Sequence, residues 1–137
     1  MNLERFIEAQ EESYEIALNE IKKGRKRSHW MWYIFPQIKG LGHSSTAQYY
    51  AIQNRAEAEA YLAHPVLSRH LLEISEELLK IESNDASRVF GYPDDLKLKS
   101  SMTLFSLVSK KTVFKRVLDK FFDGEIDERT VEFLKDK

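Results

Sequence analysis

Apolar and polar residues follow one another along most of this chain in the three- and four-residue steps of an amphipathic helix. The strongest pattern predicts a helix over residues 65–81, whose apolar face consists of Leu67, Leu71, Ile74, Leu78 and Ile81. A second face predicts a helix over residues 3–23, with glutamates early and lysines late, as the helix dipole favours. No segment alternates as a strand does, so the pattern indicates an all-α fold.

Capping residues and prolines divide the rest of the chain into further helices. Asn54 and Glu57 have the spacing of a capping box, and Pro65 suits the first position of a helix that His64 caps or packs against. We therefore predict a compact single-domain bundle of about seven helices over residues 1–137, with one aromatic-rich irregular segment. The further helices are expected over residues 45–52, 54–62, 85–90, 94–108, 113–122 and from Asp127 onward.

The exception to helical periodicity is the aromatic-rich segment, residues 28–46. It holds both tryptophans of the chain, Trp30 and Trp32, and its apolar residues fit neither a helical nor a strand period. Pro36 disfavours helix at the residue before it, so any helical turn here ends near Ile34. Bulky rings, a histidine, an amide and a glycine-rich turn together are typical of a loop that holds a ligand.

The glycine-rich turn is a candidate anion site. Gly40 and Gly42 precede a helix for which Ser45 is the predicted N-cap, and backbone N–H groups at such a position bind anions. The hydroxyls of Ser44 and Ser45 and the amine of Lys39 would add further donors. The turn is not a dinucleotide fingerprint, because the third glycine is replaced by Ser45 and no strand precedes it. A simple capped turn explains the same residues, and both interpretations stay open.

Four side chains of the aromatic-rich segment have two interpretations each. His29 is the candidate catalytic base, because imidazole is the side chain best suited to acid–base catalysis near neutral pH, or it forms a structural hydrogen bond in a loop with limited access to solvent. Trp30 and Trp32 would stack on a nucleobase or fill the core. The amide of Gln37, placed by the preceding proline, would bind a polar ligand or brace the loop.

A third cluster lies at the start of the helix expected over residues 94–108. Ser100 and Ser101 are small hydroxyl residues in an otherwise apolar helix, with Lys99 and Thr103 beside them. Small residues on a helix face let a ligand or another helix come close, so these serines are candidate ligand contacts or a packing surface.

Composition narrows the class of function. The net charge of −1 gives no case for nucleic-acid binding, and the absence of cysteine suits a reducing cytosol. No histidine pair has metal-ligand spacing, so neither a metal nor another cofactor is expected. No run is long enough for a membrane span, and the first residues lack the apolar core of a signal peptide, so we expect a cytoplasmic protein. The most basic run, residues 22–27, is interpreted as a solvated helix end.

Several motifs carry a family resemblance over nearly the whole chain. The runs at residues 29–37, 40–44, 57–67, 89–91 and 97–105 resemble the bacterial family called domain of unknown function 1810. That resemblance implies a compact, mainly helical domain in a bacterial cytosol and no established activity. The label calpastatin, sometimes attached to this family, does not fit, because calpastatins are long disordered inhibitors and this chain is short and core-rich. A more distant likeness to the NADAR group of ADP-ribose and N-glycoside enzymes concerns only size and helical content.

Two functions are consistent with these residues. The first is binding of a small anionic or nucleotide-like ligand, as an enzyme or as a binding protein, in a pocket built on the aromatic-rich segment. The alternative is a non-enzymatic interaction or regulatory module in which that segment is core. A concave pocket lined by His29, Trp32, Gln37 and Ser44 would favour the first, and a filled core the second. The sequence leaves oligomeric state, reaction and substrate open.

Overall fold

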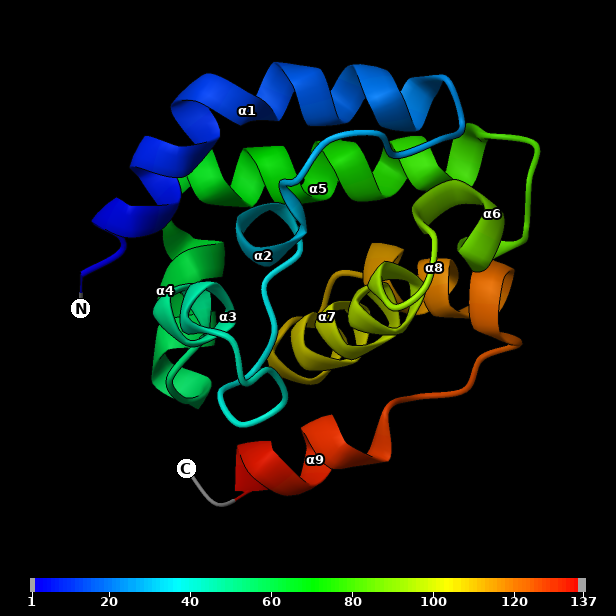
Figure 1. The fold of residues 1–137 in the computed structure, drawn as a ribbon. Helices are drawn as coiled ribbons and strands as arrows, with labels where there is room; N and C mark the ends of the chain where they lie inside the picture. Colours follow the sequence, from blue (N-terminus) through cyan, green and yellow to red (C-terminus); the bar gives the residue numbers. More distant parts are fainter. Residues whose placement is uncertain (1, 136–137) are drawn as a thin grey trace.

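The computed structural model describes residues 2–135, which fold into helices around one core (Figure 1). Over these residues there are nine helices: α1 (Glu4–Lys22), α2 (Met31–Ile34), α3 (Ser45–Tyr50), α4 (Arg55–Ala63), α5 (Pro65–Lys80), α6 (Ala86–Phe90), α7 (Asp94–Val108), α8 (Val113–Phe122) and α9 (Glu128–Lys135). The all-α prediction is confirmed, but the count of about seven is too low. Helices of one turn, such as α2, hold too few apolar positions to show a period.

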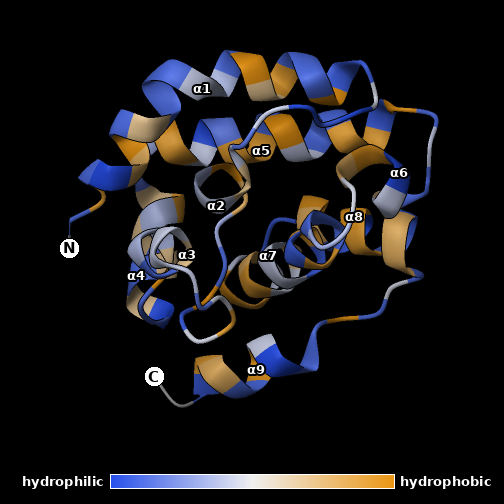
Figure 2. Cartoon of the chain, in the orientation of Figure 1, coloured by the Kyte–Doolittle hydropathy of each residue, from blue (hydrophilic) through white to orange (hydrophobic). Residues whose placement is uncertain are grey.

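The two longest amphipathic helices, α1 and α5, lie side by side along one edge of the molecule (Figure 1). Apolar residues recur along both helices (Figure 2), and those on one face of each are buried. The predicted face of α5 is confirmed, because Leu67, Leu71, Ile74 and Leu78 are each at most 1% exposed. The capping of α5 is also as predicted: Nδ1 of His64 accepts hydrogen bonds from the N–H groups of the second and third helical residues, and Pro65 fills the first position.

Helix α7 is the centre of the fold, and it packs against α4, α6, α8 and α9. Six consecutive residues, Ser100 to Phe105, are buried, so the helix is covered on all sides. Leu96, in the first turn, is 49% exposed, so the buried part of the helix begins at Leu98. The central position of α7 places the small hydroxyl residues of its middle turns inside the protein.

A short parallel pairing closes the loop between α2 and α4. The N–H of Lys39 donates to the carbonyl of Ile52, and the N–H of Ile52 donates to the carbonyl of Gln37, both at 2.8 Å. The helix predicted to reach Ile52 therefore ends at Tyr50, because the next residues are extended. This pairing fixes the start of the glycine-rich turn against the residues that follow α3.

Candidate functional site

The aromatic-rich segment divides between core and surface. Trp30 is 1% exposed and Phe35 is fully buried, and both contact the ring of Phe90. Trp32 is only partly buried, and the Nζ of Lys97 lies 5.5 Å from its ring centroid. Of the two tryptophans, Trp30 thus occupies the core position that the alternative interpretation requires, and only Trp32 has a surface that a ligand can reach.

Glu20 holds the start of the segment to α1. Its Oε1 accepts hydrogen bonds from the N–H of Arg27 at 2.8 Å, the N–H of Ser28 at 2.9 Å and the indole Nε1 of Trp30 at 2.9 Å. Its Oε2 accepts from the hydroxyl of Ser28 at 2.5 Å. Burial alone would raise the pKa of Glu20, but these hydrogen bonds favour the charged form and lower the pKa to about 2. The carboxylate is therefore a structural anchor for the loop.

His29 lies on the surface. Its side chain is exposed, and only its backbone carbonyl has a hydrogen bond among the described residues, from the hydroxyl of Tyr33 at 3.5 Å. The expectation of limited solvent access at His29 is wrong, because the indole beside it turns inward and leaves the imidazole outside. Neither a buried structural partner nor a catalytic partner for this imidazole is present in residues 2–135.

The pocket expected from His29, Trp32, Gln37 and Ser44 is not formed by these four residues together. Trp32 and Gln37 do line one hollow, with Gly42 and Tyr50 beside them. Its volume is about 10 Å³, which is room for one water molecule and not for a nucleobase. Any ligand at this hollow would have to lie on the outer face of the Trp32 ring.

The glycines of the turn are packed against other elements. A Cβ on Gly42 would lie 2.5 Å from the Cβ of Ala47, and one on Gly40 would lie 3.3 Å from the Phe133 ring. The N-cap of α3 is Ser44 and not Ser45, because the Ser44 hydroxyl accepts from the N–H of Ala47 at 3.0 Å. These contacts account for Gly40, Gly42 and Ser44 through packing and capping. Lys39 and Ser45 are exposed beside them.

The hydroxyl cluster of α7 anchors the last helix. Oδ2 of Asp127 accepts hydrogen bonds from the hydroxyls of Ser100 at 3.0 Å and Thr130 at 2.5 Å, and the N–H of Asp127 donates to the hydroxyl of Thr103 at 2.9 Å. Ser101 is fully buried, and its hydroxyl has no hydrogen-bond partner in the described part of the chain. Ser100 thus serves helix packing, and Ser101 lies inside the core.

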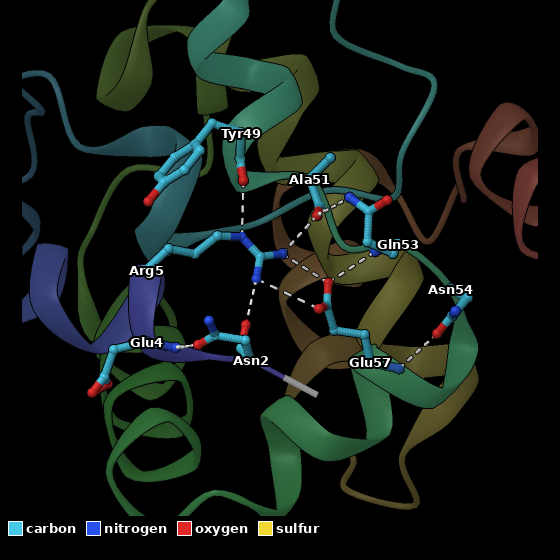
Figure 3. Close-up of polar contacts among 8 residues, drawn as sticks. All are labelled: Asn2, Glu4, Arg5, Tyr49, Ala51, Gln53, Asn54 and Glu57. Carbon is cyan, nitrogen blue, oxygen red and sulfur yellow. Dashed lines mark hydrogen bonds and ion pairs between the residues drawn. The ribbon is translucent and has the colours of Figure 1, made fainter.

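A charged clamp between Arg5 and Glu57 was not anticipated from the sequence (Figure 3). The guanidinium donates to both oxygens of Glu57, with Nη2 at 2.8 Å from Oε1, and to the carbonyls of Asn2, Tyr49 and Ala51. The five contacts use the full donor capacity of an arginine. The clamp borders a hollow of about 530 Å³, but the guanidinium has no donor left for a ligand, so the function of the clamp is to tie the start of α1 to the end of α3 and to α4.

A larger hollow, here called the basic hollow, has donors to spare. It has a volume of about 810 Å³ and lies where α1 and α5 end, next to α6. Its charged lining consists of Lys22, Lys23, Arg25, Lys80, Arg88, Glu77 and Glu82.

Most of the cations at the basic hollow have no partner within the protein. Lys80 lies 3.8 Å from Glu77, but within residues 2–135 the side chains of Lys22, Lys23, Arg25 and Arg88 form neither hydrogen bonds nor ion pairs. The basic run at the end of α1 was interpreted as a solvated helix end. It is exposed, but it also converges with cations from two other helices, and no sequence spacing shows that convergence.

Other features of the described residues limit the chemistry. No group of three or more His, Asp or Glu side chains in residues 2–135 is placed to hold a metal ion. None of the described helices is both long and apolar enough to cross a membrane.

Fold and surface together define an all-α, single-core protein with a ligand-sized basic hollow and an aromatic segment that is mostly structural. Comparison with known proteins gives the family. The chain belongs to the family described as protein of unknown function DUF1810, whose model matches residues 1–134. The resemblance drawn from the sequence motifs is thereby confirmed.

A solved structure supports the same assignment. The crystal structure of a conserved hypothetical protein from Mycobacterium tuberculosis is similar to this chain, with 42% sequence identity and a TM-score of 0.95. The similarity covers 97% of this chain and 96% of that one. No curated protein matches the chain.

Proposed function

We propose that this protein binds a small, multiply charged anion, such as a phosphate-bearing or nucleotide-like molecule, in the basic hollow. One observation supports this proposal: five cationic side chains from three elements and a loop line a hollow of about 810 Å³, against two carboxylates. Ligand pockets commonly have volumes of about 300–1,000 Å³, and a concave surface with one sign of charge concentrates ions of the other sign.

Helix dipoles explain only part of this arrangement. Lys22 and Lys80 lie in the last turns of α1 and α5, where cations are stabilised by the carbonyl ends. Arg25 follows α1 and belongs to no helix, yet it lines the same hollow. The Glu20 anchor fixes the chain just beyond it, at Arg27 and Ser28, so the aromatic-rich segment would brace the anion site without entering it.

The experiment is calorimetric titration and thermal unfolding with inorganic pyrophosphate and with ADP. A ligand that binds only the folded state, present at a concentration of about 100 times its Kd, stabilises that state by about 2.7 kcal/mol, so Tm should rise. Added salt should weaken the effect, because exposed charges are screened over about 8–10 Å at physiological ionic strength.

A pair of matched variants localises the site. The double variant Arg25→Glu, Arg88→Glu should lose the pyrophosphate response. The control variant Lys110→Glu, Lys111→Glu makes the same change in net charge on the exposed loop before α8. It should keep the pyrophosphate response. Absence of binding by the natural protein, or equal losses in both variants, would contradict the proposal and favour the non-enzymatic interaction module.

A further inference from the structure

A separate hollow of about 340 Å³ lies between α1 and α5, and we call it the His70 hollow. Gln10, Tyr14 and His70 form its inner wall, and the charged side chains around it are Glu11, Glu15, Arg69 and Glu73. It shares no residue with the basic hollow, so it is a separate candidate site.

The hydrogen bonds of Gln10 determine which nitrogen of His70 carries a proton. Gln10 is 2% exposed, and its amide nitrogen donates to the carbonyl of Tyr33 at 2.8 Å and to the hydroxyl of Tyr61 at 2.9 Å. A flipped amide would set its oxygen against the Tyr33 carbonyl, so the orientation is fixed. The amide oxygen therefore faces Nδ1 of His70 at 2.7 Å, and Nδ1 must be the donor.

The proton on Nδ1 leaves Nε2 of the neutral ring as an acceptor. The ring is held by stacking on Tyr14, with centroids 3.7 Å apart and planes 7° from parallel. Burial, and then the charge of Arg69, lower the pKa of His70, which favours the neutral form. In residues 2–135 Nε2 has no hydrogen-bond partner. The structure thus presents a rigid imidazole acceptor at the edge of a hollow.

The charges around this acceptor favour a cation. The hollow is lined by three carboxylates and one guanidinium, those of Glu11, Glu15, Glu73 and Arg69. Oε1 of Glu73 accepts a hydrogen bond from the hydroxyl of Tyr14 at 2.5 Å. Because Tyr14 also stacks on His70, this bond holds the carboxylate on the same side of the hollow as the imidazole. A ligand that fits both features carries positive charge and N–H donors together.

We propose that the His70 hollow binds a primary ammonium group, which donates one hydrogen bond to Nε2 of His70 and another to the carboxylate of Glu73. A quaternary ammonium has the same charge but no N–H donor, so it satisfies the carboxylates and not the imidazole. The difference between these two cations separates a specific site from general attraction to acidic side chains.

The test uses the full chain with ¹⁵N-labelled histidine, observed by NMR. Without ligand, His70 should show a proton on Nδ1. Methylammonium should cause a saturable shift of Nε2, whereas tetramethylammonium at the same concentration should not. Binding should weaken as pH falls, because protonation of His70 removes the acceptor. The other titratable and charged groups that line the hollow around His70 are Glu11, Tyr14, Glu15, Arg69 and Glu73.

Two substitutions on α5 complete the test. Glu73→Gln should weaken methylammonium binding several-fold, and Glu76→Gln, an exposed residue of the same helix, should not change it. The proposal is overturned if His70 has its proton on Nε2, if neither or both of the cations produce the shift, or if Glu73→Gln binds methylammonium as the natural protein does.

Discussion

Glu20 shows how one carboxylate can fix an irregular segment. Four donors from three positions of the loop converge on it, and one of them is the indole that carries the largest buried ring of the chain. An indole N–H buried without an acceptor would be costly, so Glu20 is what permits Trp30 to enter the core.

Replacing Glu20 by Gln should destabilise the fold, because the amide keeps the shape of the side chain but loses the charge and cannot accept all four bonds. We expect a loss of about 1–3 kcal/mol in the free energy of unfolding. Urea denaturation measures it, with Glu12→Gln, an exposed residue of the same helix, as the control.

The same substitution tests the pKa of Glu20. A carboxyl whose pKa is about 2 when folded, against 4.5 ordinarily, contributes stability above pH 4.5 and loses it as pH falls toward 2. The difference between the natural protein and Glu20→Gln should therefore shrink over this range. A constant difference would show that the pKa of Glu20 is not lowered.

At the level of single residues, the sequence singled out the irregular segment and left the role of each residue open. The pairing of Trp30 with Glu20 joins residues ten positions apart across a turn, and no periodicity shows it. The roles of Gly40 and Gly42 depend on contacts with Phe133 and Ala47, which only the folded chain provides. His64, whose cap is local, was predicted correctly because its partners are the next residues of the chain.

Among the helices, α9 depends most visibly on one side chain. Asp127 is the point where α9 meets α7, and its carboxylate accepts hydroxyl donors from both helices. Most other helices are held by apolar faces, and the buried residues of α9 are only Thr130 and Leu134.

Asp127→Ala should loosen α9 without unfolding the rest. Loss of a capping carboxylate costs about 0.5–2 kcal/mol, and here the Ser100 hydroxyl also loses an acceptor. Hydrogen exchange should speed up in α9 and stay slow in α5 and α7. Glu132→Gln, exposed on α9, is the control, and equal exchange in both variants would show that apolar packing alone holds α9.

The long helices could be predicted from the sequence because many apolar positions and local caps support each one. The five-residue helix α6 was expected over residues 85–90, and Asp85 caps it locally. The four-residue helix α2 has no periodic pattern, so its formation depends on tertiary packing. The burial of α7 on all sides could not be predicted either. Its place between four other helices is a property of the whole arrangement.

The whole molecule has one core, to which α1, α5, α7 and α8 all contribute. Residues far apart in sequence meet at its edge, as Arg5 and Glu57 do in the clamp and Gln10 and His70 do in their hollow. Such pairs, and the convergence of cations at the basic hollow, cannot be read from spacing, because the packing of separate helices creates them.

A single core implies that a cavity at its centre lowers the stability of the entire domain. Leu71→Ala should cost about 2–5 kcal/mol, since the side chain is 1% exposed and the surrounding helices cannot collapse fully into the space. Urea unfolding followed by circular dichroism and by tryptophan fluorescence should shift together. Ile16→Ala, half exposed on α1, should stay within about 0.5 kcal/mol of the natural protein.

The placement of the two hollows along α1 and α5 gives the molecule an electrical polarity that its net charge of −1 conceals. The carboxylates of the His70 hollow lie on the earlier turns of these helices, and the cations of the basic hollow lie at their ends. Glu15 and Lys22 are seven residues apart on α1, which is about 10 Å along the axis. In dilute buffer neighbouring molecules should attract one another head to tail, and at physiological salt, where the Debye length is about 8 Å, that attraction should fade. Solubility would then increase with added salt.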